Sequence, residues 1–168
     1  DQIKNFLKRK EFSIKIETVS DGEKILDTGG GILNMIRSSS DNDYIIFNPD
    51  TLWHESYLKE IKNMSEFYFS KKLDNLLLLS NKDLSFDKDL SGDFNLKNNL
   101  INKDIKVFNY IGCQILNKNL FRKYKINYFS ISEIWNELMI EKKLNGFESL
   151  NKFYHLTNLK TFKKLQDL

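Results

Sequence analysis

The sequence predicts an α/β fold around a mostly parallel β-sheet. Two observations support this. First, helix and strand patterns alternate over the first half of the chain: helical spacing at 3–7, strand alternation at 12–16, a helix at 32–37 and a strand at 44–47. This order favours parallel pairing with right-handed crossovers. Second, the four large side chains at 44–47 indicate a central strand buried on both faces.

That strand is followed by Asn48-Pro49-Asp50. Pro49 has no N–H for a ladder and keeps Asn48 extended, so the strand must end there. Asp50 is thereby placed at the carboxyl end of a strand, where open α/β sheets bind ligands. Two roles remain open for it: a cap for the next helix, or a ligand of Mg²⁺ that bridges phosphate oxygens.

The run Gly29-Gly30-Gly31 precedes the predicted helix that ends near Arg37. Without Cβ atoms, the backbone can approach a base, ribose or phosphate, and the helix start supplies N–H donors. The alternative is a flexible turn capped by Asp27 or Thr28. Neither a Walker A pattern nor Gly-x-Gly-x-x-Gly occurs, which disfavours P-loop and dinucleotide-binding proteins.

The remaining patterns continue the alternation. They predict a helix at 57–69, a strand at 76–79, a poorly structured stretch at 80–104, a strand at 107–116, a helix opened by a capping box at 130–133, and a strand within 147–154. A last helix, capped by Thr157 or Asn158, would turn Leu159, Phe162 and Leu165 inward. No linker or repeat interrupts the chain, so we expect one domain over 1–168.

The composition limits the possible functions. Of 168 residues, 40% are hydrophobic, enough for a real core, and the net charge of +3 comes from lysines that alternate with acidic residues. This is a solvated surface, so we expect no nucleic-acid partner. A single cysteine and no apolar run of membrane-spanning length predict a cytoplasmic protein without a membrane partner.

Other reactive side chains give weak signals. His54 and His155 lack a zinc-binding spacing, and His54 is expected on the surface in the first turn of a helix. Cys113 lies in an apolar strand and is expected to be a small core residue. Trp53 and Trp135 are expected to pack in the interior.

Several segments resemble one enzyme family in the order in which the family has them. They are residues 23–32 (EKILDTGGGI), 48–53 (NPDTLW), 92–94 (GDF), 110–116 (YIGCQIL), 129–131 (FSI) and 153–159 (FYHLTNL). Together they resemble sugar-1-phosphate nucleotidyltransferases, closest to the N-acetylmuramate-1-phosphate uridylyltransferase and mannose-1-phosphate guanylyltransferase-like branch. The resemblance covers nearly the whole chain.

The resemblance implies a Rossmann-like three-layer α/β/α nucleotidyltransferase domain. It would join a nucleoside triphosphate (UTP or GTP) to a sugar 1-phosphate with Mg²⁺, releasing pyrophosphate, in nucleotide-sugar biosynthesis for the cell envelope. Asp50 would be the catalytic residue and metal ligand. The implied nucleotide-binding residues are Thr28, Gly29, Gly30 and Asn48, and the implied sugar-binding residues are Asp93, Gly112 and His155.

The chain departs from the family in two places. The family's first strand and its Gly-x-Gly-x-Arg phosphate loop would precede residue 1, so we expect a truncated domain, inactive alone, with an exposed apolar edge beside the strand that ends at Asp50. The family's Asp-x-Gly-Thr is replaced by residues 155–158, which places His155 where a carboxylate is usual. The alternative is a non-catalytic sugar-nucleotide-binding or regulatory module that lacks the phosphate loop.

Overall fold

A computed structural model describes residues 2–156 and 158–166. The chain forms two compact units. The first contains residues up to 40 together with 125–131, and the second contains 41–124 and the residues from 132 onward. Each unit is described by itself below. One domain over 1–168 stays a prediction.

The first unit contains the helices α1 (Gln2–Lys8) and α2 (Asp27–Arg37), both close to their predicted positions. Helix α2 buries Ile32, Leu33 and Ile36 on one face, as its apolar spacing predicts. The glycines are the third to fifth residues of α2, so the helix starts before them and not after them.

The strand predicted at 12–16 is wrong. Residues 9–26 contain neither helix nor strand, and Ile14 is 69% exposed. Alternating apolar residues are only a local signal, and a strand also needs a neighbour that accepts its backbone hydrogen bonds. No described segment supplies one here.

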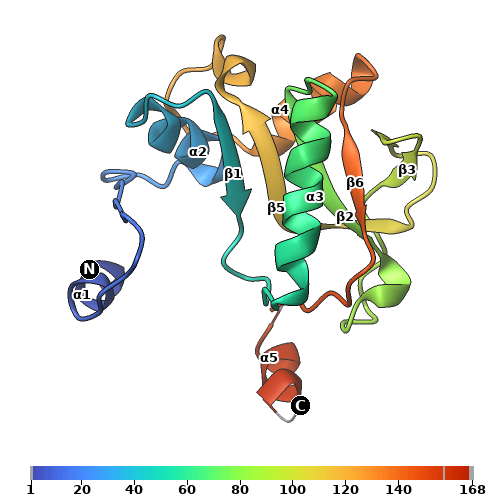
Figure 1. The fold of residues 1–168 in the computed structure, drawn as a ribbon, viewed down its shortest axis with the longest axis horizontal. Coiled ribbons are helices and arrows are strands. Elements are labelled where there is room, and N and C mark those ends of the chain that lie inside the picture. The colour runs from blue at the N-terminus through green and yellow to red at the C-terminus, as the bar shows by residue number, and fades with distance from the viewer. Residues whose placement is uncertain (1, 157, 167–168) are drawn as a thin grey trace. The chain divides into compact units, whose positions relative to one another are not determined.

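The second unit is built on a mixed four-stranded sheet in the order β1-β5-β2-β6 (Figure 1). Its strands are β1 (Asp43–Phe47), β2 (Asn75–Asn81), β5 (Phe108–Asn117) and β6 (Gly146–Ser149). Strand β5 runs antiparallel to both of its neighbours, and β6 runs parallel to β2. Three of the four strands therefore point the same way. A separate hairpin, β3 (Asn95–Lys97) and β4 (Leu100–Asn102), falls in the stretch expected to be poorly structured.

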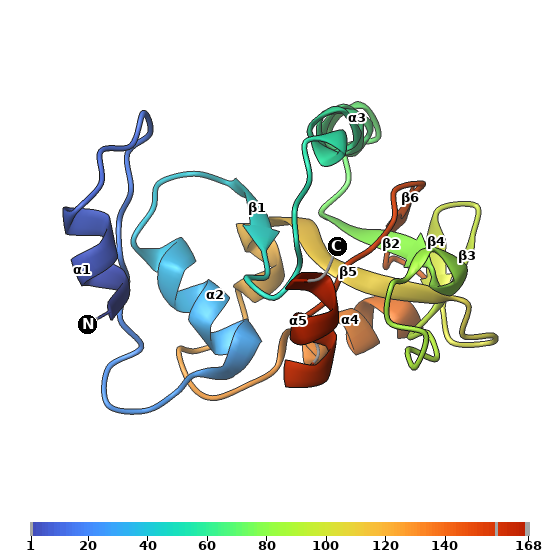
Figure 2. The same ribbon diagram turned by 90° about the horizontal axis from the view of Figure 1, so that it is seen from below.

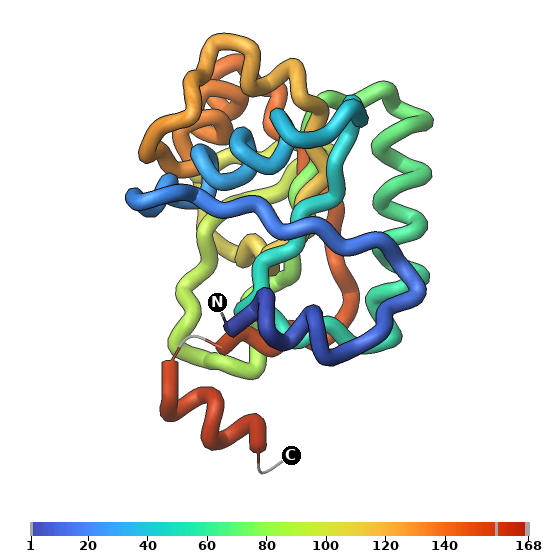
Figure 3. Tube along the Cα trace, turned by 90° about the vertical axis from the view of Figure 1, so that its left-hand side faces the viewer, coloured from blue at the N-terminus to red at the C-terminus, as the bar shows by residue number. Residues whose placement is uncertain are grey.

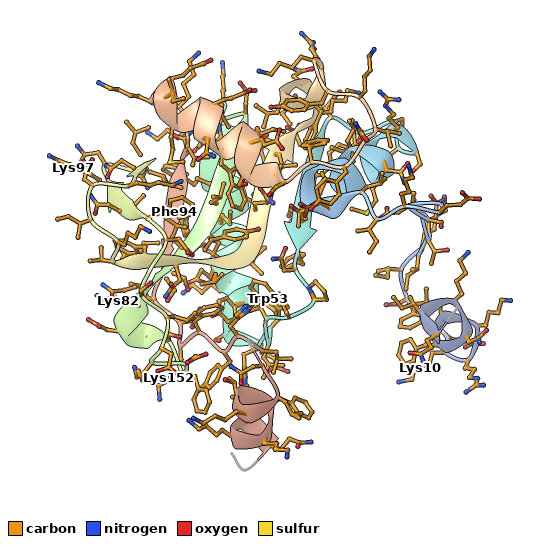
Figure 4. All side chains as sticks on the ribbon, turned by 180° about the vertical axis from the view of Figure 1, so that it is seen from behind. Lys10, Trp53, Lys82, Phe94, Lys97 and Lys152 are labelled. Atoms are coloured by element: carbon orange, nitrogen blue, oxygen red, sulfur yellow. The ribbon has the colours of Figure 1, made fainter. Side chains whose placement is uncertain are left out.

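Helices α3 (Ser56–Ser70) and α4 (Ile131–Ile140) lie on opposite sides of this sheet (Figures 2 and 3). Strand β2 explains the arrangement, because successive side chains of a strand face opposite ways. Leu76 and Leu78 join the core beneath α3, whereas Leu77 and Leu79 join the core shared by α4 and the hairpin. Trp53 packs against the first core and Phe94 belongs to the second (Figure 4).

Strand β1 ends where it was predicted to end, but it is not a central strand. It pairs with β5 along one edge, and no other strand of the described residues pairs with it. Ile45 and Phe47 are 44% and 45% exposed. The prediction of burial on both faces is wrong for this chain, whereas the expected apolar edge beside Asp50 is present.

The C-terminal helix α5 (Leu159–Gln166) begins at the predicted place, and the Asn158 side chain caps it by accepting a hydrogen bond from the Thr161 N–H at 2.9 Å. The alternative cap, Thr157, lies outside the described residues. The predicted inward face is wrong: Leu159 is 67% exposed, and the buried residue of α5 is Thr161. None of the helices in the described residues is long and apolar enough to cross a membrane.

Candidate functional site

The site is built on residues 48–51, directly after β1. The Asn48 N–H donates a hydrogen bond to the Gly112 carbonyl at 2.7 Å, and the Thr51 hydroxyl donates to the Ile111 carbonyl at 2.9 Å. Both acceptors lie on β5. The turn that carries Asp50 is therefore fixed to the middle of the sheet by two hydrogen bonds, and not only by the end of its own strand.

Residues 154–156 approach this turn from the other end of the sequence. The Leu52 N–H donates to the Tyr154 carbonyl at 3.0 Å, and the Leu156 N–H donates to the Asp50 carbonyl at 2.8 Å. This antiparallel contact brings the His155 side chain to Asp50, with 3.8 Å between Nε2 and Oδ2. The two residues form an ion pair when the imidazole is protonated.

Both side chains retain polar atoms without a partner. The Asp50 side chain is 47% exposed, but its Oδ1 is buried and accepts no hydrogen bond from the described residues. The same is true of His155 Nδ1, whose ring stacks on Phe153 with 5.7 Å between centroids. A buried polar atom without a partner costs roughly 1–3 kcal/mol, and native proteins rarely leave one unexplained. A ligand or ion that binds here would remove this cost.

His155 also lines a cavity of about 260 Å³, whose other residues include Asp93 and Asn109. Asp93 is held in place because its Oδ2 accepts a hydrogen bond from the Tyr110 N–H at 3.0 Å. The structure therefore brings together two of the predicted sugar-binding residues, Asp93 and His155, and connects them to Asp50.

The third predicted sugar-binding residue, Gly112, has a local structural reason to be glycine. Its φ is +85°, and an added Cβ would lie 2.9 Å from the Asn48 Cβ and 3.0 Å from the Thr51 hydroxyl oxygen. Gly112 thus allows β5 to approach the turn that carries Asp50. Its role in sugar binding stays a prediction.

Thr28, Gly29 and Gly30 lie in the first unit, and their polar groups are used internally. The N–H groups of both glycines donate to the Phe129 carbonyl, at 3.0 and 3.1 Å, and the Thr28 hydroxyl accepts from the Ile131 N–H at 3.1 Å. An added Cβ would meet the Phe129 ring at Gly29 and the Asn127 carbonyl oxygen at Gly30. Close packing on 127–131 explains both glycines, and their nucleotide role stays a prediction.

Burial makes two nearby acids poor proton donors. It raises the pKa of the Tyr110 hydroxyl well above 10, with further contributions from the Cys113 thiol and the Asp50 carboxylate. It also raises the pKa of Cys113 to about 12. Cys113 is therefore a protonated core residue at neutral pH, as predicted, and not a nucleophile.

His54 is exposed, as predicted, but it lies two residues before α3 and not in the first turn of the helix. Both tryptophans pack, as predicted. Trp53 packs between the rings of Phe47 and Tyr57, and the Trp135 indole N–H donates to Gln114 at 3.1 Å. Within residues 2–156 and 158–166, no group of three or more His, Cys, Asp or Glu side chains could hold a metal ion.

Sequence reasoning missed Asn109. It is only 3% exposed, lines the same cavity as His155, and its Nδ2 has no hydrogen-bond partner in the described chain. A signal was available, because an amide stands between two aromatic residues inside a strand expected to be buried. Such a side chain needs a partner in the fold or a ligand.

Neither protein-family profiles nor curated protein sequences match this chain. Solved structures do. HddC from Yersinia pseudotuberculosis complexed with GMP-PN superposes with a TM-score of 0.58 at 19% identity over 84% of this chain. UDP-glucose pyrophosphorylase complexed with UDP-glucose gives 0.62 at 14% identity over 86% of it. The inositol-1-phosphate CTP transferase from T. maritima gives 0.54 at 12% identity over 73% of it.

These similarities show a shared fold. The chain covers 62%, 62% and 52% of the three structures, which is less than two thirds of the length of each. The α/β architecture expected from the sequence therefore agrees with that of these solved structures.

Proposed function

We propose that this chain carries the catalytic domain of a sugar-1-phosphate nucleotidyltransferase. The products would be a nucleoside-diphosphate sugar and pyrophosphate, made from UTP or GTP and a sugar 1-phosphate. The carrying observation is Asp50, which lies in the turn after β1 with one buried carboxylate oxygen unpaired and the other 3.8 Å from His155. The fold similarity adds support, because the similar structures include a CTP transferase and a complex with UDP-glucose.

The unpaired oxygen of Asp50 suits a hard cation, so Asp50 would hold Mg²⁺. One protein carboxylate is sufficient for this ion, which usually keeps several waters and binds substrate phosphates. Bound there, Mg²⁺ would neutralise the charge that gathers where two phosphorylated substrates meet.

The side chains themselves would align the substrates. In the reaction, a phosphate oxygen of the sugar 1-phosphate forms a bond to the α-phosphorus, and the bond from this phosphorus to pyrophosphate breaks. No covalent enzyme intermediate is needed, so positioning dominates. The hydrogen bonds of Asn48 and Thr51 to β5 hold Asp50 in place, and His155 in its protonated form would add positive charge beside it.

We further propose that the complete domain has the three-layer Rossmann-like fold, with its first strand region pairing with the free edge of β1. The exposed Ile45 and Phe47 support this, since an apolar strand edge normally has a partner or a cover. The coding sequence upstream of Asp1 tests the point. A Gly-x-Gly-x-Arg segment in frame is expected there, and its absence would contradict the proposed pairing.

The activity test uses this chain, together with the longer protein if the reading frame extends upstream. Each is incubated with Mg²⁺, UTP or GTP, and a panel of sugar 1-phosphates, and both pyrophosphate and nucleotide sugar are measured. The variant is Asp50→Asn, which keeps size and capping ability but removes the charge. Turnover should fall on the order of 10²-fold, about 2.7 kcal/mol of transition-state stabilisation, with the thermal midpoint unchanged.

Asp104→Asn is the matched control. It makes the same chemical change at an exposed position after β4, and should turn over like the unchanged protein. If Asp50→Asn turns over as fast as the unchanged protein, Asp50 is not a catalytic residue and the proposal is contradicted.

A second candidate function is the non-catalytic module that binds a sugar nucleotide. One observation favours it: the residues lining the cavity beside His155 include no lysine or arginine to hold a triphosphate. In that case the nucleotide sugar would bind without pyrophosphate release, and calorimetry in parallel with the activity assay distinguishes the two.

A further inference from the structure

The cavity beside His155 has a definite chemical character. Its lining includes two acidic residues, Asp89 and Asp93, and two apolar residues, Leu90 and Phe153. The other polar side chains of the lining belong to Ser91, Asn109, Tyr110 and His155, and no lysine or arginine lines the cavity. The cavity thus combines hydrogen-bonding groups and apolar surface with negative charge.

Asn109 is the most constrained of these groups. It lies on β5 opposite Ser80 of β2, so its backbone position is fixed by the sheet. The side chain is 3% exposed and its amide nitrogen, which can donate two hydrogen bonds, has no partner among the described residues. Because the Asn109 amide nitrogen makes no hydrogen bond within the described chain, it contributes little to the fold. It is available to donate to an acceptor atom of a bound molecule.

The charges determine what that molecule can carry. Asp89 and Asp93 line the cavity and are both exposed, so they repel a carboxylate or phosphate in it with a strength that salt reduces. Asp50 adds a third carboxylate, 3.8 Å from His155. A hydroxyl is compatible with all of these groups, because it can accept from an amide and donate to a carboxylate. The apolar side chains can pack against the C–H face of a sugar ring.

From this arrangement we infer that Asn109 is a specificity-determining residue, whose amide holds a hydroxyl of a neutral sugar, while Asp89 and Asp93 reject sugars that carry a carboxylate. The inference rests on the proposed function in taking a sugar 1-phosphate as the ligand. The cavity receives the sugar part, and the phosphate group stays outside it.

Binding is measured by calorimetry with three neutral hexose 1-phosphates (of glucose, galactose and mannose) and with glucuronic acid 1-phosphate. At least one neutral compound should bind the unchanged protein, and glucuronic acid 1-phosphate should bind at least about tenfold more weakly than glucose 1-phosphate. Asn109→Leu keeps the approximate size and removes the donor, so it should weaken binding of the neutral compound about tenfold.

Two further variants test the argument. Asn63→Leu makes the same chemical change on the exposed face of α3 and should leave binding unchanged. Asp89→Asn removes one repelling charge from the cavity lining. The ratio of the affinity for glucose 1-phosphate to the affinity for glucuronic acid 1-phosphate should therefore fall by about threefold or more. A residue that only packs would not change this ratio.

Thermal unfolding without ligand separates recognition from folding. Because the Asn109 amide nitrogen has no hydrogen bond to lose, the midpoint of Asn109→Leu should equal or exceed that of the unchanged protein. A lower midpoint would assign Asn109 to the fold and overturn the inference. Three binding results would also overturn the inference. The first is that Asn109→Leu binds the neutral compound as tightly as the unchanged protein does. The others are equal affinity for glucose 1-phosphate and glucuronic acid 1-phosphate, and no binding of any neutral hexose 1-phosphate.

Failure of the proposed function would look different. Hexose 1-phosphate binding that depends on Asn109, with no pyrophosphate release, supports the cavity assignment and contradicts the transferase. Pyrophosphate release that is indifferent to Asn109→Leu supports the transferase and contradicts the cavity assignment.

Discussion

The glycine run of α2 and the turn after β1 both resemble ligand-binding segments, yet their atoms are used differently. In the first unit, the N–H groups of Gly29 and Gly30 and the hydroxyl of Thr28 all have partners within 127–131. In the second unit, Asp50 and His155 each retain a buried polar atom without a partner. Folding accounts fully for the observed contacts of the first segment and only partly for those of the second.

This difference gives a physical criterion for separating structural residues from functional ones. A residue whose groups are all paired or packed contributes to folding, and its replacement should cost stability. A residue kept with unmet polar groups contributes little to folding, and its replacement should mainly cost binding or activity. Substitutions in the two segments should therefore affect stability very unequally.

The largest effect is expected for Gly30→Ala. The added methyl would meet the Asn127 carbonyl oxygen and lie 3.0 Å from the Leu26 Cβ, and main-chain atoms cannot move aside easily. The free energy of unfolding, measured by urea titration with circular dichroism, should fall by about 3 kcal/mol. Gly31→Ala is the control. Its nearest neighbour would be 3.9 Å away, and alanine favours a helix, so stability should stay equal or rise by up to about 1 kcal/mol. Equal stability of the two variants would break the comparison.

Gly112→Ala tests whether the turn after β1 also contains a structural glycine. Its φ of +85° and the close Asn48 and Thr51 atoms predict a loss of about 2–3 kcal/mol. Gly22→Ala has nearly the same φ, +86°, but no atom within 4 Å of the added Cβ, so only the backbone cost of about 1 kcal/mol should remain. Similar losses in both variants would mean that β5 and the turn are not in close contact.

A smaller effect is expected for Thr28→Val, which removes the acceptor of the Ile131 N–H but keeps the side-chain shape. The free energy of unfolding should fall by about 1–2 kcal/mol. Thr28→Ser retains the hydroxyl and should recover most of this loss. If the serine variant is no more stable than the valine variant, the hydrogen bond is not the reason for threonine at this position.

The smallest effects on stability are expected at the candidate site. Asp50→Asn and His155→Gln should each change the free energy of unfolding by no more than about 0.5 kcal/mol, since the partly exposed pair is separated by 3.8 Å. Thermal and urea unfolding of both variants measure this. A loss above about 1.5 kcal/mol at either position would place the pair with the structural residues and remove the contrast with α2.

Local patterns in the sequence were sufficient for most elements. Helices α2 and α3 and strands β2 and β5 lie where apolar periodicity places them, because periodicity reports which side chains one element can bury. The end of β1 was equally predictable, since Pro49 has no N–H for a ladder and keeps Asn48 extended. The position of Asp50 at a strand end therefore followed from the sequence alone.

Other features were decided only when distant segments met. The residues at 12–16 alternate like a strand but have no pairing neighbour, and β1 is apolar throughout yet lies at an edge. The meeting of His155 with Asp50 depends on residues 154–156 pairing with the turn after β1, and the burial of Asn109 depends on the sheet around β5. Sequence determines what each polar group can donate or accept. Whether a polar group finds a hydrogen-bond partner is decided by the tertiary structure, because the two groups are often far apart in the sequence and meet only when the chain folds.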